Sequence, residues 1–227
     1  MDHLTKKKVF GLVVGLSFGL MFMGTLRISA EYPNILTPLA GYATPGYVVI
    51  TLIFTILFVH IGVPFYRFGF ARRPDLRQIM LALAAIAILR VFTFALNPLI
   101  EDLFGPRNLE RFSNVQGSFV SLVVLLIINW TLAAFGEEFT YRIVLMRTIS
   151  FLFGDTGKGQ IYALLLQTLL FGLIHAYQGP AGIVSSAFSG LVFGTVTIAA
   201  RWSIWPAGIA HGTNNTIGII ALYYGNV

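Results

Sequence analysis

Two adjacent glutamates followed by an arginine form the group in this sequence best suited to acid–base chemistry. A helix would place Glu138 and Arg142 on one face, because they are four residues apart. Glu137 would then point about 100° away from Glu138. Arg142 can neutralise one carboxylate while the other, buried and without a cation beside it, suits a general base. The same residues also fit an interfacial salt bridge at a helix end.

Two histidines extend this chemistry to later parts of the chain. His175 follows Phe171 by four residues, near the end of an apolar stretch. His211 and Asn215 are also four residues apart, so a helix directs both to one face while Asn214 points elsewhere. A histidine and an amide on one face can donate two hydrogen bonds to a developing oxyanion. Taken singly, each of these residues also fits a structural polar contact between helices.

The composition shows what kind of elements must position these residues. Only 11% of the 227 residues are charged and 56% are hydrophobic, whereas ordinary soluble proteins have roughly 25% charged residues. These values exclude a soluble globular domain, a disordered tail and a coiled coil. The sequence contains no cysteine, which excludes disulfides, thiolate metal sites and cysteine nucleophiles.

Apolar segments of the length needed to cross a bilayer recur along the chain. They cover 9–28, 47–65, 79–96, 115–135, 161–177, 181–200 and 204–224. The shorter segment 137–153 either continues the fourth span or forms its own. The first segment follows three lysines but is longer than a signal-peptide core, so we expect a retained anchor. We expect an all-α polytopic transmembrane bundle of about eight helices, forming a single integral membrane domain over 1–227.

The distribution of basic residues predicts the orientation of the chain in the cell membrane. One side carries Lys6, Lys7, Lys8, Arg67, Arg72, Arg73, Arg77, Arg142, Arg147, Lys158 and Arg201. The other side has mainly Arg27, Arg107 and Arg111. We therefore expect a cytoplasmic amino terminus and an outside linker over 97–114. The net charge of +6 then reflects topology and contact with membrane lipid, and we expect no nucleic acid partner.

Ionisable groups at membrane depth are costly, on the order of 2.5–3.5 kcal/mol each on insertion scales. Three apolar segments nevertheless contain the glutamate, histidine and asparagine clusters described above. Their joint occurrence indicates one convergent polar site, suited to hydrolysis by an activated water. Arg90 is a further membrane-depth charge, and we expect it to pair with Glu138 or a loop acid, or to contact a substrate carboxylate.

Small residues recur every four positions in three of the apolar segments, a spacing that lets membrane helices approach closely. The positions are Gly11, Gly15 and Gly19, then Gly190 and Gly194, then Gly208 and Gly212. We expect these glycines to serve close packing within one chain.

At its polar clusters the sequence resembles the CAAX prenyl protease and bacteriocin-processing family of intramembrane proteases, also called the Abi or CPBP family. That family has two glutamates followed after three residues by arginine, then Phe-x-x-x-His, then His-x-x-x-Asn or Asp. The matching residues are Glu137, Glu138, Arg142, Phe171, His175, His211 and Asn215, in order, within about 118–218.

The resemblance implies an intramembrane endopeptidase built as an eight-helix bundle, with its site open toward the cytoplasmic leaflet. It implies that Glu137, helped by His175, activates the attacking water. It implies that His211 and Asn215 stabilise the tetrahedral oxyanion. The substrate would be a peptide or protein, either prenylated, as in the CAAX-processing members, or a leader-type peptide.

By the same resemblance, Glu138 and Arg142 would support the geometry of the site. The family resemblance is compatible with a bound divalent metal such as zinc, because Glu137, His175 and His211 match a zinc ligand set of two histidines and one glutamate. The same residues also fit a metal-free water activated by the glutamate, and their spacing does not decide between the two.

Three alternatives remain open from the sequence. Ser189 and His211 could act as the nucleophile and base of a rhomboid-type serine protease, although Ala187 replaces a glycine of that motif. A non-enzymatic membrane immunity or scaffold protein could use the polar cluster to bind a peptide tail. A proton-coupled transporter could use Glu137 and the histidines as a relay, although no internal repeat is visible.

Overall fold

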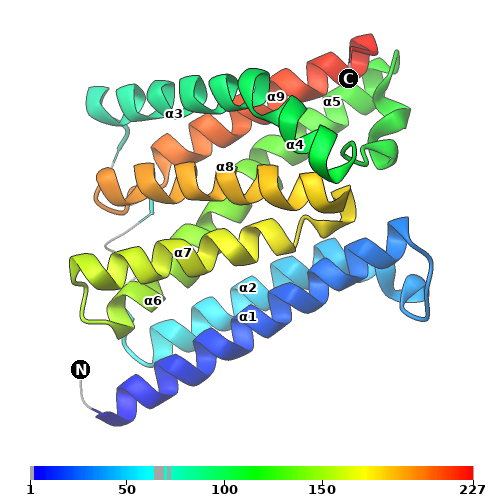
Figure 1. Ribbon diagram of the computed structural model, residues 1–227. Helices are drawn as coiled ribbons and strands as arrows, with labels where there is room; N and C mark the ends of the chain where they lie inside the picture. The colour runs from blue at the N-terminus through cyan, green and yellow to red at the C-terminus, as the bar shows by residue number, and fades with distance from the viewer. Residues whose placement is uncertain (1–2, 64–68, 71–72, 227) are drawn as a thin grey trace.

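The computed structural model describes residues 3–63, 69–70 and 73–226, and these residues form helices and connecting loops (Figure 1). The α-helices are α1 (His3–Glu31), α2 (Ala43–His60), α3 (Leu76–Ala95), α4 (Asn97–Phe104), α5 (Phe119–Ile128), α6 (Arg147–Leu152), α7 (Gly157–Leu173), α8 (Gly179–Ala199) and α9 (Trp205–Tyr224). Two π-helical segments, Asn129–Glu137 and Phe139–Met146, join α5 to α6, and 3₁₀ helices cover Thr37–Tyr42, Glu110–Val115 and Ala176–Gln178. The expected all-α bundle of about eight helices is confirmed.

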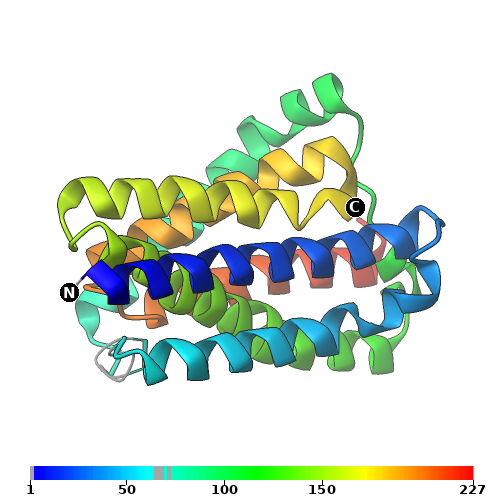
Figure 2. The ribbon, with the colours of Figure 1, turned by 90° about the horizontal axis from the view of Figure 1, so that it is seen from below.

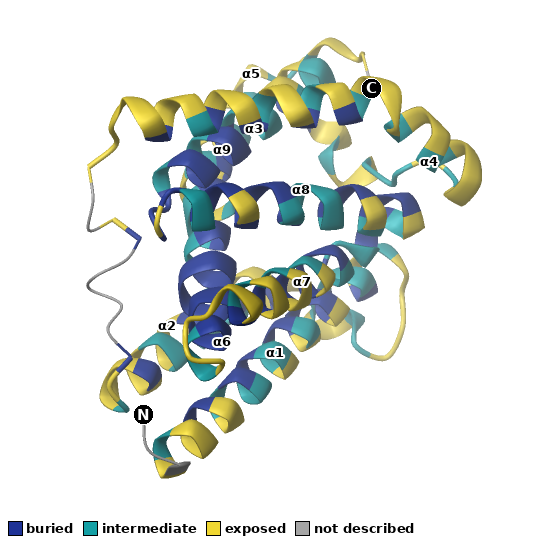
Figure 3. Ribbon diagram, turned by 60° about the vertical axis from the view of Figure 1, so that its left-hand side comes forward, coloured by how far each residue is buried: buried dark blue, intermediate teal, exposed yellow. Residues whose placement is uncertain are grey.

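Five helices of the described chain are long and apolar enough to cross a membrane, which makes this a multi-pass membrane protein. They span Leu4–Glu31, Thr37–His60, Leu76–Ala95, Phe119–Leu152 and Ala176–Ala199. The expected spans at 161–177 and 204–224 form α7 and α9, which are not among the five. Large apolar side chains on the outer surface, such as Phe18 at 74% and Phe94 at 77% exposed, suit contact with lipid. Figure 3 shows exposed residues on the outward sides of the helices and buried residues where helices meet.

Most of the helices run from one end of the bundle to the other and back. Each end of the bundle therefore contains the first residues of some helices and the last residues of others. The end that contains the start of α1 also contains the ends of α2, α6 and α8 and the starts of α3, α7 and α9 (Figure 1). We call this the amino-terminal end, and the other the opposite end. Figure 2 shows α1 and α2, which pack against each other, running side by side between the two ends.

The segment 137–153 continues the fourth span instead of forming its own, because α5, the two π-helical segments and α6 are one continuous helix over Phe119–Leu152. Ser118 caps its start by accepting a hydrogen bond from the backbone N–H of Ser121 at 3.3 Å. π-Helical geometry is rare and is found frequently at functional sites. Here it surrounds both glutamates, so successive side chains there turn by a smaller angle than on an α-helix.

The expectation of an irregular linker over 97–114 was wrong in one respect, because its first part forms α4. Pro98 occupies the first turn of this helix, where its missing N–H is tolerated, and Gly105 ends it with a φ of 83°. Leu99 and Leu103 are exposed on this short helix. The predicted end of the second span, Phe65, and the basic residues Arg67 and Arg72 lie outside the described residues.

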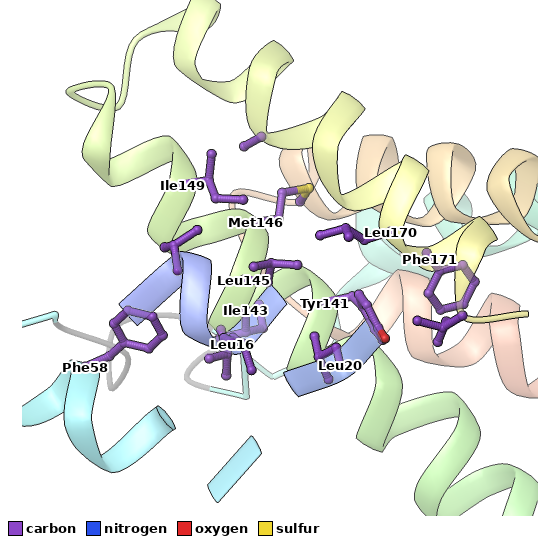
Figure 4. Close-up of a cluster of buried hydrophobic side chains, with 14 of the residues drawn as sticks. Leu16, Leu20, Phe58, Tyr141, Ile143, Leu145, Met146, Ile149, Leu170 and Phe171 are labelled. Atoms are coloured by element: carbon purple, nitrogen blue, oxygen red, sulfur yellow. The ribbon is translucent and has the colours of Figure 1, made fainter. Parts of the chain in front are cut away.

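An apolar core runs along the inside of the bundle between α1, α2, the long helix and α7 (Figure 4). Ile143, Leu145 and Met146 are fully buried there, together with Leu16 and Leu20 of α1. The core therefore packs the long helix tightly against α1.

Close packing at the glycines is confirmed for most of the expected positions. An added Cβ would lie 3.4 Å or less from another part of the chain at Gly15, Gly19, Gly190, Gly194, Gly208 and Gly212, whereas at Gly11 it would meet nothing within 4 Å. At Gly212 the nearest atoms belong to the Trp130 ring, at 2.5 Å. Because Gly212 has no side chain, α9 can lie directly against the π-helical segment at this position.

Candidate active site

Glu138 is the centre of a buried chain of polar contacts that joins two helices. Its Oε2 atom lies 2.9 Å from Nε of Arg142, which confirms the predicted ion pair one turn apart. Its Oε1 atom lies 2.8 Å from Nδ1 of His211 on α9. Glu138 and Arg142 are completely buried. Both carboxylate oxygens of Glu138 are thus occupied by partners within the protein.

Arg142 is held in place by aromatic rings and a backbone carbonyl. Its guanidinium lies 4.4 Å from the ring centre of Phe171 and 5.4 Å from that of Phe193, within the range of cation–π attraction. Its Nη2 also donates to the carbonyl oxygen of Gly190 at 3.4 Å. These contacts fix the cation that neutralises Glu138, and they connect the site to α7 and α8.

Glu137 faces a different cation from its neighbour. Its Oε1 atom lies 3.8 Å from Nη1 of Arg27 on α1, and its side chain is 9% exposed. The Arg27 guanidinium lies over the Tyr47 ring at 5.8 Å, which adds α2 to the surroundings. Arg27 is a site residue that sequence reasoning missed, because we assigned it to a membrane face. The available signal was a cation inside the first apolar segment.

His175 lies in the turn after α7, next to Phe171. Its Nδ1 lies 2.7 Å from the carbonyl oxygen of Phe171. Because a carbonyl oxygen can only accept, Nδ1 carries the proton in this contact, and Nε2 of a neutral ring is left as an acceptor. The ring centres of His175 and His211 lie 4.8 Å and 6.2 Å from that of Phe171. Phe171 therefore packs against both histidines.

His211 lies in the first half of α9. A neighbouring ring fixes the orientation of its side chain, and Glu138 contacts one of its ring nitrogens. Its ring stacks on that of Phe193, with centres 4.8 Å apart and an angle of 14° between the planes. The contact from Nδ1 to Glu138 leaves Nε2 as the nitrogen that can face a substrate. Asn215 follows one turn later and is partly exposed, and its side chain makes no hydrogen bond with any residue that the structure describes.

Arg90 does not pair with the partners that we expected. On α3, its Nη2 donates to Oδ1 of Asn214 on α9, and neither Glu138 nor a loop acid is its partner in the described part of the chain. The expected structural pairing is therefore present, but to an amide. The physical reason is that α3 packs along α9, whereas Glu138 is already enclosed by its own partners.

Asn129 is a second residue that sequence reasoning missed. It is buried at the start of the first π-helical segment, and its Nδ2 donates to the carbonyl oxygen of Gly212 at 3.0 Å and to Thr216 at 3.3 Å. These bonds tie α9 to the long helix beside His211. The available signal was an amide within an otherwise apolar stretch, which in membrane helices favours an interhelical hydrogen bond.

The three residues of the hypothetical zinc set are not assembled as metal ligands. No group of three histidine, cysteine, aspartate or glutamate side chains within residues 3–63, 69–70 and 73–226 is arranged to hold a metal ion. Glu137 instead faces Arg27, and Nδ1 of His211 faces Glu138. The donor set therefore does not fit a zinc site in this arrangement, and we assign no chemical step to a metal.

The pair proposed for a serine protease is also not formed. The Ser189 hydroxyl donates to the carbonyl oxygen of Ser185 on its own helix at 3.0 Å. His211, its hypothetical base, contacts Glu138 through Nδ1. The arrangement does not activate Ser189 as a nucleophile.

The motifs and their geometry can now be compared with known proteins. Residues 119–217 match the family described as type II CAAX prenyl endopeptidase Rce1-like. The match runs from the first turn of α5 into α9 and includes Glu137, His175 and His211, but not Arg27. No curated protein and no solved structure matches the chain. The chain therefore carries, in residues 119–217, a domain of the Rce1-like type II CAAX prenyl endopeptidase family of intramembrane proteases.

Proposed function

We propose that the protein is an intramembrane endopeptidase in which Glu137 activates the attacking water. The observation that carries this proposal is the different situation of the two adjacent glutamates. Glu138 uses both oxygens for Arg142 and His211, whereas Glu137 has a single cation at 3.8 Å, beyond hydrogen-bond distance. Glu137 is thus the carboxylate that is still able to accept a proton from water.

The proposed reaction gives each of these residues a role. Glu137 accepts a proton from a water molecule as the water oxygen bonds to the carbonyl carbon of the scissile peptide. His175 assists by accepting a hydrogen bond from the same water through Nε2. When the tetrahedral intermediate collapses and the C–N bond breaks, Glu137 passes its proton to the leaving nitrogen. A positioned acid–base group of this kind contributes about 10²–10⁴-fold to the rate.

His211 and Asn215 stabilise the oxyanion in this proposal. This role requires a proton on both ring nitrogens of His211, so that Nδ1–H donates to the Glu138 carboxylate while Nε2–H donates to the oxyanion. His211 is oriented by Glu138, which in turn is held by Arg142, so the ring does not need to reorganise during the reaction. The Asn215 amide lies one turn further on the same helix with its N–H groups unused. Glu138 and Arg142 then act as positioning residues.

The whole chain, residues 1–227, works as one membrane domain in this proposal. It is supported by Arg27, which reaches Glu137 from α1, far outside the segment that matches the family. The substrate is a peptide or protein held at the membrane, and the two classes to be tested are a prenylated carboxyl-terminal peptide and a leader-type peptide.

The test uses the full chain reconstituted in lipid vesicles, with two fluorescence-quenched probes: a farnesylated CAAX peptide and an unprenylated leader-type peptide. The wild type should cleave at least one probe, Glu137→Gln should abolish that cleavage, and Ser189→Ala should retain it. Comparing the membrane peptides of cells that express wild type or Glu137→Gln gives an independent readout, in which uncleaved substrates accumulate with the variant.

Two results would overturn the proposal. Retained cleavage in Glu137→Gln with loss in Ser189→Ala would establish a serine mechanism. Identical peptide populations in the two cell lines, with no probe cleaved by the wild type, would favour an immunity or scaffold protein that binds peptides without cutting them.

A further inference from the structure

A hollow of about 480 Å³ lies near the amino-terminal end of the bundle. It is formed by the start of α1, the end of the long helix and the middle of α7 (Figure 1). Ligand pockets commonly measure about 300–1,000 Å³, so this hollow has room for part of a small molecule. The described residues that line it do not include Glu137, Glu138, His175 or His211. It is therefore separate from the candidate active site.

The interior of this hollow is apolar and is shared by three helices. Val13 of α1 and Ile149 of α6 are buried, and Leu166 of α7 completes the lining. Phe10 and Phe153 line the same hollow and are 62% and 53% exposed, so the hollow is open to the surroundings of the bundle. In a membrane-spanning bundle these surroundings are lipid tails, which are as apolar as leucine. The hollow therefore suits a hydrocarbon chain.

Two lysines line the same hollow where α1 begins. Lys6, Phe10 and Val13 are four and three residues apart, so they follow one face of the helix from its polar start into its apolar part. Lys7 is the next residue after Lys6, and both are exposed. Lysines near the end of a membrane helix lay their apolar stems along the protein and keep the ammonium group at the interface. The hollow thus combines an apolar interior with two positive charges.

The protein does not supply an anion for these charges in the part that the structure describes. Neither lysine forms an ion pair with an acidic side chain there. The two described acidic residues at this end, Asp75 and Asp155, have other partners. Asp155 pairs with Arg147, and Asp75 accepts a hydrogen bond from the backbone N–H of Gln78 at 2.8 Å. The charge of the two lysines therefore favours an anionic ligand.

An anionic phospholipid has both of the properties that the hollow requires. Basic pockets between membrane helices bind the head groups of anionic lipids on the cytoplasmic side. The sequence predicts that this end of the chain faces the cytoplasm, whose membrane leaflet carries anionic lipids. A soluble anion would leave the apolar hollow unfilled, and a zwitterionic lipid would bring no net negative charge to the lysines.

We propose that the hollow between α1, α6 and α7 binds an anionic phospholipid. The head group lies at Lys6 and Lys7, and one acyl chain lies against the apolar lining. The bound lipid bridges α1, which is outside the family segment, to α6 and α7, which are inside it. The proposal does not depend on the proposed function, because no residue of the candidate active site lines the hollow.

The experiment uses native mass spectrometry of the full chain in detergent, which resolves each bound lipid by its mass. Phosphatidylglycerol, which is anionic, and phosphatidylcholine, which is zwitterionic, are added separately with identical acyl chains. Lys6→Gln and Lys7→Gln each remove one charge that lines the hollow. Lys8→Gln is the matched control, because Lys8 is exposed on the same helix but does not line the hollow. Leu166→Trp fills part of the hollow with a larger side chain.

The wild type should bind phosphatidylglycerol more tightly than phosphatidylcholine. One basic residue near an anionic lipid changes the affinity about fivefold, so Lys6→Gln and Lys7→Gln should each raise the Kd for phosphatidylglycerol by about that factor. Lys8→Gln should change this Kd much less. Leu166→Trp should weaken the binding of phosphatidylglycerol. Glycerol phosphate, which has the anionic group without acyl chains, should not displace the lipid.

The proposal is wrong if the two lipids bind equally, or if Lys8→Gln weakens binding as much as Lys6→Gln, since the attraction would then belong to the whole end of the bundle. Displacement by glycerol phosphate, or unchanged binding in Leu166→Trp, would exclude the acyl chain from the hollow. A complex of two chains without lipid would show that a second copy covers the hollow instead. Glu137→Gln should bind the lipid as the wild type does, so the result is independent of whether the protein cleaves peptides.

Discussion

Nδ1 of His211 lies 2.8 Å from Oε1 of Glu138, although the two residues are far apart in the sequence. Through this contact α9 is joined to the long helix, and the Glu138–Arg142 ion pair becomes a chain of three groups. A buried polar network is costly when one member is missing, because the others are then left without partners. This relationship is the reason why we propose a positioning role for Glu138 and the catalytic role for the adjacent Glu137.

Glu138→Gln should therefore destabilise the fold more than Glu137→Gln. The substitution leaves the fully buried Arg142 without its anion, and breaking a buried ion pair costs about 3–5 kcal/mol. Glu137→Gln affects a partly exposed partner, Arg27, and should cost less. Thermal unfolding in detergent measures both, and equal melting temperatures for the two variants would contradict the assignment.

Arg27→Gln should lower catalysis more than it lowers stability. A misplaced catalytic group can cost up to about 100-fold, so we expect kcat/KM to fall about 10- to 100-fold, mainly through kcat. Arg27→Lys keeps the charge and should retain most of the activity. The melting temperature should fall less than in Glu138→Gln, because Arg27 and Glu137 are 3.8 Å apart and slightly more exposed than Glu138 and Arg142. An increase in KM with kcat unchanged would show instead that Arg27 binds substrate.

Gly212→Ala should destabilise the contact between α9 and the long helix. The new Cβ would lie 2.5 Å from the Trp130 ring, and overpacking of this kind costs about 1–3 kcal/mol. Gly218→Ala in the same helix is a matched control, because its Cβ would meet nothing within 4 Å. That control should be neutral or slightly stabilising, since alanine favours helices over glycine. Unfolding curves measured in detergent are sufficient for this comparison. Equal curves for the two variants would contradict the close contact between Gly212 and Trp130.

Arg90→Leu should melt a few degrees earlier with normal activity. It removes the hydrogen bond to Asn214, and interhelical hydrogen bonds in membranes contribute about 0.6 kcal/mol, at most roughly 2 kcal/mol. Asn214→Ala should lower the melting temperature by a similar amount. The double variant should lower it no further than the more destabilising single variant does. A loss of activity in Arg90→Leu at unchanged stability would mean that Arg90 contacts the substrate instead.

The parts of the site that depend on local spacing were predictable from the sequence. The Glu138–Arg142 pair follows from two residues four positions apart on one helix, and the structure confirms it at 2.9 Å. The helical bundle was predictable for a similar reason, since the length of an apolar segment determines whether it can cross a bilayer. The catalytic roles of Glu137, His175, His211 and Asn215 remain predictions.

Contacts between distant helices were not predictable, because they depend on how the bundle packs. The sequence around Arg27 does not indicate that this residue faces Glu137. The sequence around Arg90 likewise does not indicate that it bonds to Asn214 and not to an acidic residue. The π-helical geometry of Asn129–Met146 was not predictable either. No spacing of residue types in this segment distinguishes a π-helix from an α-helix. The helix α4 was missed because a short polar stretch resembles a loop.

The position of Arg27 on the first helix has a consequence for how this protein can be divided. Residues 119–217 contain the family motifs, but the cation opposite Glu137 comes from elsewhere in the chain. If Glu137 acts as proposed, the family segment alone lacks the cation that faces it. In a chimera, an unrelated first helix would leave Glu137 without the Arg27 guanidinium, so we expect that a functional transplant has to include α1 together with residues 119–217.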